Sequence, residues 1–229
     1  VKTEISDGCN EVWLTSTDNG CYGLDIESDL PELVNAVSEI DKQFFIRVGM
    51  MNPMYMPKIR DGLLKSFESN KVFKFLHVPV QSGSNKVLND MKRGHTEKTF
   101  RDITNEFRKK FERFTISTDV IVGFPTETEE DFEDTLNLLE NTKPDIVNLS
   151  KYSQRPGTSA AEMKQIDVTE VKRRSKITYE LINRISEKNN KNWIGWEGQV
   201  IFDEEHEDQI RGRNFAYKPI FVKEKPKIG

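Results

Sequence analysis

The segment Thr115–Phe132, TISTDVIVGFPTETEEDF, constrains the fold more than any other part of this 229-residue chain. In its first half, isoleucine and valine alternate with polar residues, which is typical of a strand with one apolar and one polar face. Gly123 ends that strand, and Thr126 with Glu129 has the spacing of a capping box at a helix start. The segment therefore predicts one strand–helix unit of an α/β fold, in which ligands bind at the carboxyl ends of the strands. An ordinary strand–helix joint without a ligand is the alternative.

The same strand–helix unit recurs along the chain at intervals of roughly 30 to 40 residues, the length of a βα repeat. Further strands are predicted at residues 11–16, 44–50, 73–81 and 146–152. Helices are predicted at residues 31–40, from 57, at 84–91 and at 96–111. Five strands separated by helices favour a parallel sheet or barrel.

The two faces of these strands differ in polarity. The apolar set, expected to face the helices, is Leu14, Ile46, Val48, Leu76, Val78, Val80, Val120, Val122, Val147 and Leu149. The opposite set is Thr15, Arg47, His77, Gln81, Ser117, Asp119, Asn148, Ser150 and Tyr152. Because an unpaired buried polar group costs about 1–3 kcal/mol, this face is expected to hold a polar ligand or water. The alternative is a self-satisfied network, for example Arg47 paired with Asp119.

Composition narrows the class of protein. Charged residues make up 31% of the chain and the formal net charge is −4, so no global nucleic-acid footprint is present. No apolar run reaches the length of a membrane span, and we expect a cytoplasmic protein. The two cysteines, Cys9 and Cys21, match no zinc or iron–sulfur spacing and predict reduced thiols and no metal site.

The pattern changes after Gly157. Residues 167–193 predict one long helix that contains the basic run KRRSK, for which a solvated face is the default interpretation. Short β segments follow, so we divide the chain into a barrel at residues 1–195 and a small β-domain at 196–229. Arg211, Arg213 and Lys218 alternate there with aromatic residues, which suits single-stranded RNA, although packing on the barrel is equally consistent.

Three motifs carry a resemblance to a known family. VPVQSGSNKVLNDMKRGHT, from Val78 to Thr96, and STDVIVGFPTETEEDF resemble the radical S-adenosylmethionine (SAM) methylthiotransferases. EVWLTSTDNGCYGLD, from Glu11 to Asp25, is most similar to the archaeal and eukaryotic branch, which acts on N6-threonylcarbamoyladenosine in the tRNA anticodon loop. The stretch GRNFAYKPIFV resembles the start of a TRAM domain, a small RNA-binding β-domain.

The resemblance implies an α/β fold: a partial (β/α)6 TIM-like barrel lacking its first βα unit, followed by an incomplete TRAM-like domain. It implies SAM as cofactor, with 4Fe–4S clusters in the full-length enzyme. The CxxxCxxC loop that would hold the SAM-binding cluster is absent from this chain, so we expect the fragment alone to bind no cluster and to be inactive. A ribosomal-protein methylthiotransferase fragment and a non-catalytic RNA-binding protein with a degenerate barrel are the alternatives.

The resemblance also implies binding residues, although it implies no catalytic residue. Those expected around SAM lie near strand ends: Ser16, Thr17, Asp18, Gln81, Ser82, Ser117, Asp119, Gly123 and Tyr152. The loop at Ser16 is expected to meet the SAM amino group, and Gly123 to let the adenine approach the backbone. The RNA-binding set is Arg211, Arg213 and Lys218. Lys92 and Arg93 have the charge to bind a carboxylate or phosphate, with a plain surface loop as the alternative.

Overall fold

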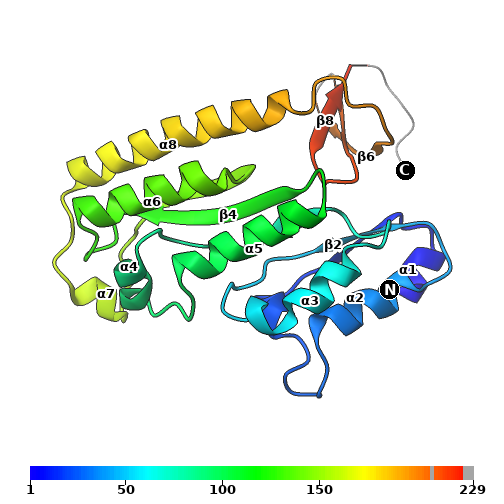
Figure 1. Ribbon diagram of the computed structural model, residues 1–229, viewed down its shortest axis with the longest axis horizontal. Coiled ribbons are helices and arrows are strands. Elements are labelled where there is room, and N and C mark those ends of the chain that lie inside the picture. Colours follow the sequence, from blue (N-terminus) through cyan, green and yellow to red (C-terminus); the bar gives the residue numbers. More distant parts are fainter. Residues whose placement is uncertain (207–208, 224–229) are drawn as a thin grey trace.

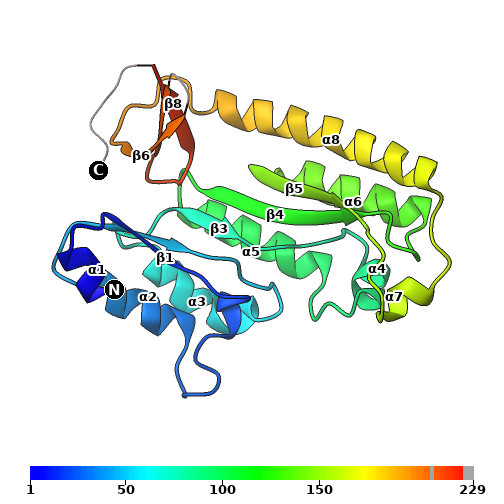
Figure 2. The same ribbon diagram turned by 180° about the vertical axis from the view of Figure 1, so that it is seen from behind.

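The computed structural model describes residues 1–206 and 209–223, and in that part of the chain five parallel strands follow one another in sequence order (Figure 1 and Figure 2). The strands are β1 (Glu11–Leu14), β2 (Phe45–Val48), β3 (Phe75–His77), β4 (Thr115–Val122) and β5 (Ile146–Lys151). They form one sheet of order β1-β2 and one of order β3-β4-β5, linked by a bridge between Ile46 and Val72. The predicted parallel α/β architecture is confirmed.

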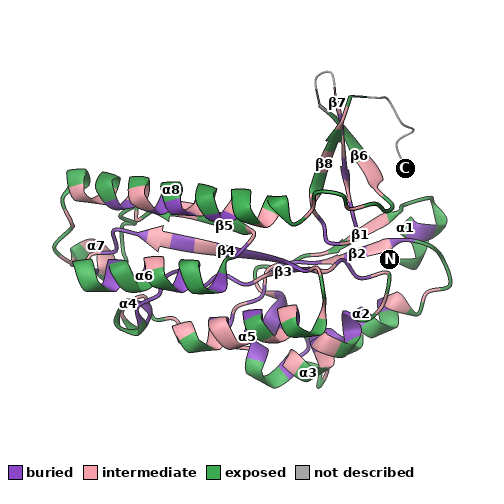
Figure 3. Ribbon diagram, turned by 45° about the horizontal axis from the view of Figure 1, so that its top comes forward, coloured by how far each residue is buried: buried purple, intermediate pink, exposed green. Residues whose placement is uncertain are grey.

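The longer helices run alongside the strands, and the shorter ones lie near the strand ends (Figure 3). They are α1 (Lys2–Ser6), the 3₁₀ turn η1 (Asn19–Cys21), α2 (Leu30–Ser38), α3 (Met56–Ser66), α4 (Asn85–Asp90), α5 (Glu97–Lys110), α6 (Glu129–Thr142), α7 (Ser159–Glu162) and α8 (Val168–Lys191). Along the outer layer α2 contacts α3, α3 contacts α5, α5 contacts α6 and α6 contacts α8. None of the helices in the described residues is long and apolar enough to cross a membrane.

The apolar core lies between the strands and these helices. Of the side chains predicted to face the helices, those on β2, β3 and β4 and in the segment after β3 are buried: Ile46, Val48, Leu76, Val78, Val80, Val120 and Val122. Thr118 shares their face at 0% exposure, and its hydroxyl donates to the Val78 carbonyl and accepts from the Val80 N–H. The period-two alternation of β4 therefore sets which residues fill the core.

Two local expectations were wrong. The capping box of α6 is formed by Thr128 and Asp131, not by Thr126 and Glu129. Thr126 instead donates its hydroxyl to Asp90 Oδ2 at 2.6 Å, so the helix begins at Glu129. The predicted strand at residues 73–81 is regular only over β3, because Pro79 lacks an N–H for the ladder and Gln81 has a positive φ of 71°.

The C-terminal residues form a three-stranded antiparallel sheet of β6 (Ile201–His206), β7 (Gln209–Arg213) and β8 (Pro219–Val222), seen beside the end of α8 in Figure 2. The turn between β7 and β8 closes the amino-terminal end of the barrel. Tyr217 is 7% exposed and its ring contacts Phe73 and Phe75, while the Lys74 N–H donates to the Phe215 carbonyl at 2.8 Å. Residues 207–208 and 224–229 of the predicted small domain lie outside the described residues.

Candidate functional site

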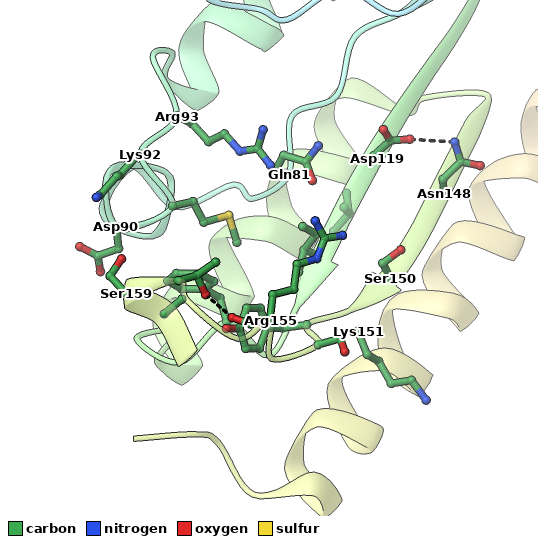
Figure 4. A pocket seen from close by; sticks show the side chains of 18 of the residues that line it. Gln81, Asp90, Lys92, Arg93, Asp119, Asn148, Ser150, Lys151, Arg155 and Ser159 are labelled. Carbon is green, nitrogen blue, oxygen red and sulfur yellow. Dashed lines mark hydrogen bonds between the residues drawn. The ribbon is translucent and has the colours of Figure 1, made fainter. Parts of the chain in front are cut away.

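A cavity of about 890 Å³ opens at the carboxyl ends of β4 and β5 (Figure 4). The polar strand face predicted from the sequence supplies one wall, with Gln81, Asp119, Asn148, Ser150 and Tyr152. The end of α4 with the loop after it, Phe124 after β4 and the segment after β5 supply most of the rest. The cavity therefore lies at the strand edge where α/β folds bind ligands.

Asp119 is held as an ionised carboxylate at the cavity wall. Its Oδ1 accepts hydrogen bonds from Asn148 Nδ2 at 2.7 Å and from His77 Nε2 at 3.1 Å. Burial alone would raise the pKa of Asp119, but these two hydrogen bonds outweigh it, and the pKa lies below its ordinary value. Both partners come from neighbouring strands, so the parallel register fixes the carboxylate.

The alternative pairing of Asp119 with Arg47 is wrong. The Arg47 guanidinium carbon lies 5.0 Å from the ring centroid of Trp13, 5.2 Å from that of Phe75 and 5.3 Å from that of Tyr217. Cation–π contact with several rings stabilises this charge toward the amino-terminal end of the barrel. The negative charge of Asp119 thus stays next to the cavity.

Gln81 enters the cavity from an unusual backbone conformation. Its φ of 71° is left-handed, a conformation that costs a residue with a side chain about 1–3 kcal/mol. Hydrogen bonds to β4 on both sides hold it there: its N–H donates to the Asp119 carbonyl at 2.8 Å, and its carbonyl accepts from the Ile121 N–H at 2.9 Å. The residue is 8% exposed, and its amide lies next to the cavity.

Two buried polar atoms at this cavity have no partner within the described residues: Tyr152 Oη and Arg93 Nε. Tyr152 follows β5, and its ring lies edge-on against Phe124 with centroids 5.4 Å apart. Because buried donors are normally satisfied, such atoms indicate a site for a polar ligand or ordered water. SAM, with ribose hydroxyls, a carboxylate and an ammonium group, fits this set of donors and acceptors.

Ser82 and Ser117 lie outside the cavity lining. Ser82 is 0% exposed, and its hydroxyl lies 3.3 Å from Thr135 Oγ1 and accepts from the Ser84 N–H at 3.1 Å. Its side chain therefore anchors the turn to α6. Ser117 is 3% exposed on β4, two positions before Asp119 and further from the strand's carboxyl end.

The packing of α8 accounts for a glycine at position 123, without the predicted approach of adenine to the backbone. The φ of Gly123 is +80°, and a Cβ added there would lie 2.7 Å from a methyl carbon of Val171 on α8. Its N–H donates to Glu127 Oε1 at 3.0 Å, so this donor is already used. The glycine lets α8 approach the strand end closely.

The predicted loop after β1 also stands apart from the cavity lining. Ser16 and Thr17 are exposed, and Asp18 caps η1 through Oδ1, which accepts from Gly20 N at 2.9 Å and Asn52 N at 3.0 Å. The Asp18 side chain thus ties the loop after β1 to the loop after β2.

The segment after Tyr152, for which no site residue was predicted, also lines the cavity, with Arg155, Gly157, Thr158 and Ser159. The signal was present as the dipeptide Pro156-Gly157, a turn signal four positions after the end of the predicted strand. The Thr158 N–H donates to the Arg155 carbonyl at 3.3 Å, and Gly157 has a φ of +80°. These residues form a tight turn that returns the chain across the cavity mouth.

The three predicted RNA-binding residues are engaged within the protein. Arg211 pairs with Glu204. Arg213 Nε lies 3.6 Å from Asp203 Oδ2, and its guanidinium is 4.6 Å from the Tyr217 ring centroid. Lys218 Nζ donates to Asn190 Oδ1 at 2.6 Å. Their charges hold the small sheet together and join it to the end of α8.

The residues present do not fit an iron–sulfur cluster. Within residues 1–206 and 209–223, no group of three or more His, Cys, Asp or Glu side chains is placed to hold a metal. Cys9 is exposed, and the Cys21 thiol donates to the Asp18 carbonyl at 3.2 Å.

A parallel α/β fold with a polar cavity at the strand ends defines the class of protein, and comparison with known families agrees. The family model described as the Radical SAM superfamily matches residues 2–139. The chain belongs to this superfamily, whose members use SAM and a 4Fe–4S cluster.

The particular relatives are tRNA-modifying enzymes by name. The chain is 45% identical over 210 residues to the "Probable threonylcarbamoyladenosine tRNA methylthiotransferase" of Archaeoglobus fulgidus, covering 91% of this chain and 49% of the relative. A protein of the same name from Methanocaldococcus jannaschii is 46% identical over 87% of this chain and 47% of its own length. The Drosophila melanogaster "Threonylcarbamoyladenosine tRNA methylthiotransferase" is 37% identical, and the match covers 96% of this chain and 40% of the relative. The chain thus spans about half the length of the archaeal relatives it matches.

Solved structures support the fold. Coproporphyrinogen III oxidase from Escherichia coli, a radical SAM enzyme, aligns with a TM-score of 0.54 at 17% identity, covering 84% of this chain and 44% of that one. The radical SAM methyltransferase of Kitasatospora setae, solved with cobalamin and a 4Fe–4S cluster, aligns with a TM-score of 0.52 at 13% identity, covering 70% and 29%. At such identities the likeness concerns the fold alone.

Proposed function

We propose that this chain is the barrel of a methylthiotransferase that modifies C2 of N6-threonylcarbamoyladenosine next to the anticodon of tRNA. The observation that carries the proposal is the 45% identity over 91% of the chain to a relative of that name. The long motifs at Val78–Thr96 and after Thr115 contribute residues to the lining of the cavity, which supports the proposal. In this proposal the protein acts in the cytoplasm and the C-terminal sheet begins an RNA-binding TRAM-like domain.

The cavity residues suit SAM as the bound cofactor. The ionised carboxylate of Asp119 attracts a cationic ligand, and SAM carries a sulfonium and an ammonium group. Gln81 offers an amide donor and acceptor, and Tyr152 offers a buried hydroxyl with no partner in the described residues. SAM would supply a carbon-centred radical able to remove a hydrogen atom from a C–H group only after accepting one electron from a 4Fe–4S cluster, and the described residues of this chain do not provide that cluster's ligands. The chain's own residues orient the cofactor and exclude water from it.

Ser16, Thr17, Asp18, Ser82, Ser117 and Gly123 remain proposals as SAM contacts. In the described conformation the side chains of Asp18 and Ser82 and the N–H of Gly123 are used in turns, so we assign them to the shape of the site. Direct contact is expected first from Gln81, Asp119 and Tyr152.

The test uses the intact protein, expressed in a host whose own threonylcarbamoyladenosine methylthiotransferase is deleted. Mass spectrometry of tRNA nucleosides should detect the 2-methylthio derivative, and Asp119→Ala should abolish it while leaving the far-UV circular dichroism unchanged. Isothermal calorimetry of the same variant should show weakened SAM binding. Unmodified tRNA from the deletion strain that expresses the wild-type protein would refute the proposal. A mass shift on a ribosomal protein would favour the ribosomal branch instead, and RNA binding without any modification would favour a non-catalytic role.

A further inference from the structure

The cavity carries more positive charge than its own carboxylates balance. Four cationic side chains line it, Lys92, Arg93, Lys151 and Arg155, against two acids. Both acids are engaged elsewhere: Asp119 accepts from His77 and Asn148, and Asp90 accepts from Thr126. The surplus favours a ligand with a negative charge.

Only two of the four cations point into the cavity. In Figure 4 the guanidinium of Arg93 lies beside Gln81 and that of Arg155 lies between Gln81 and Asp119, whereas Lys92 and Lys151 point outward. Within the described residues neither arginine forms an ion pair or a side-chain hydrogen bond, and Arg93 Nε is buried without a partner. Burial lowers the pKa of Arg93, and the negative charge of Asp119 opposes that shift without a direct ion pair between the two side chains in the described residues.

The backbone fixes where both arginines start. Helix α4 ends in a Schellman motif: the Arg93 N–H donates to the Leu88 carbonyl at 2.8 Å, and the Lys92 N–H donates to the Asn89 carbonyl at 2.9 Å. Lys92 occupies the left-handed position with a φ of 57°, where glycine is usual. Arg155 opens the tight turn across the cavity mouth, so the two arginines face the cavity from separate, ordered segments.

We propose that Arg93 and Arg155 bind a carboxylate, and that it is the carboxylate of the threonyl group on the substrate nucleoside. Two guanidinium groups match the planar, two-oxygen geometry of a carboxylate. The buried position of Arg93 Nε favours a small group that enters with the base over a backbone phosphate of a polynucleotide. This inference rests on the proposed function, because it takes its substrate from it.

The test compares two anticodon stem-loop RNAs with the intact protein. One carries N6-threonylcarbamoyladenosine, and the other carries the same nucleoside with its carboxylate replaced by a neutral amide. At fixed salt concentration we expect the wild type to bind the carboxylate RNA about 10-fold to 100-fold more tightly, the range for hydrogen bonds to a charged group. Arg93→Gln and Arg155→Gln should reduce that ratio to near one, and the Arg→Lys variants should retain part of it.

Matched controls separate this role from general effects. Arg184→Gln removes one charge from α8, where the side chain is 70% exposed and pairs with Glu140, and should leave the ratio unchanged. Should Arg93→Gln fold poorly, Arg155→Gln carries the test, because Arg155 is exposed and its side chain forms no hydrogen bond or ion pair in the described part of the chain. SAM affinity, measured separately, should be the same in all variants.

Each contrary outcome overturns the inference in its own way. Equal affinity of the wild type for both RNAs means that the carboxylate is not read. If the variants keep the affinity ratio of the two RNAs but bind SAM more weakly, the arginines bind the carboxylate of SAM. If the variants bind both RNAs more weakly by the same factor, the arginines bind phosphate. Should the intact protein methylthiolate the nucleoside and still fail this comparison, only the carboxylate assignment falls; absence of methylthiolation defeats the proposed function itself.

Discussion

The buried ion pair between Glu127 and Arg174 offers the most quantitative test of this structure. Their side chains are 0% and 6% exposed, and Arg174 Nη1 donates to Glu127 Oε1 at 2.7 Å and to the Glu127 carbonyl at 3.0 Å. Glu127 in turn accepts from the Gly123 N–H. The pair therefore fixes the turn between β4 and α6 to α8, and the Glu127 N–H donates to the carbonyl of Phe124, which lines the cavity.

Arg174→Met keeps most of the packing but leaves Glu127 buried without its cation. The carboxylate can escape that cost only by taking up a proton. Protonation at pH 7 of a carboxyl group whose ordinary pKa is 4.5 costs about 3.4 kcal/mol, since each pKa unit corresponds to about 1.36 kcal/mol. Burial already raises the pKa of Glu127 in the wild type, although Arg174 opposes it, so this figure is an upper limit for the charge. We expect a loss of about 2–4 kcal/mol in the free energy of unfolding at pH 7.

Urea unfolding followed by circular dichroism at pH 7 and pH 5 measures this loss. In the variant the folded-state pKa of Glu127 is raised further, so the penalty grows as pH rises above the unfolded value. It should therefore shrink to about 1 kcal/mol at pH 5, where protonation is nearly free. Arg173→Met on the next residue of α8, whose side chain is 42% exposed, is the matched control and should change stability far less. A small, pH-independent loss in Arg174→Met would refute the argument.

Three further predictions concern the same architecture. Gly123→Ala should lower the free energy of unfolding by about 1–3 kcal/mol, because its Cβ meets Val171 at a left-handed φ; Val171→Ala should recover part of that loss in a denaturation series. Tyr217→Ala should lower the free energy of unfolding by about 3 kcal/mol and speed amide exchange in β7 and β8. Equal exchange rates in wild type and variant would contradict the packing of the C-terminal sheet on Phe73 and Phe75 through this ring. The pKa of Asp119 should lie below 3.8 in an NMR titration, and the stability that the carboxylate provides above that pH should disappear as pH falls through the lowered pKa. His77→Ala should raise the pKa of Asp119, and an unchanged pKa would show that His77 does not lower it.

The sequence was sufficient for features that depend on local periodicity. The alternation along β4 assigned Val120 and Val122 to the core and Asp119 to the polar face, because the side-chain period of a strand leaves no other choice. The recurrence of strand and helix likewise predicted the parallel sheet. The position of the cavity followed from both, since the polar faces of parallel strands end at one edge.

Only the tertiary structure decided which partner each polar group meets. Local pattern placed Arg47 and Asp119 on one face, but distance along the strands separates them, and aromatic rings from β1, β3 and the distant C-terminal turn surround Arg47. Gly123 is explained by Val171, a residue 48 positions later whose approach no local motif encodes. Arg155 reaches the cavity because a turn after β5 folds back over strands built earlier in the chain. Side-chain periodicity fixes the direction of a residue relative to its own strand, whereas its neighbours are set by how elements remote in sequence pack together.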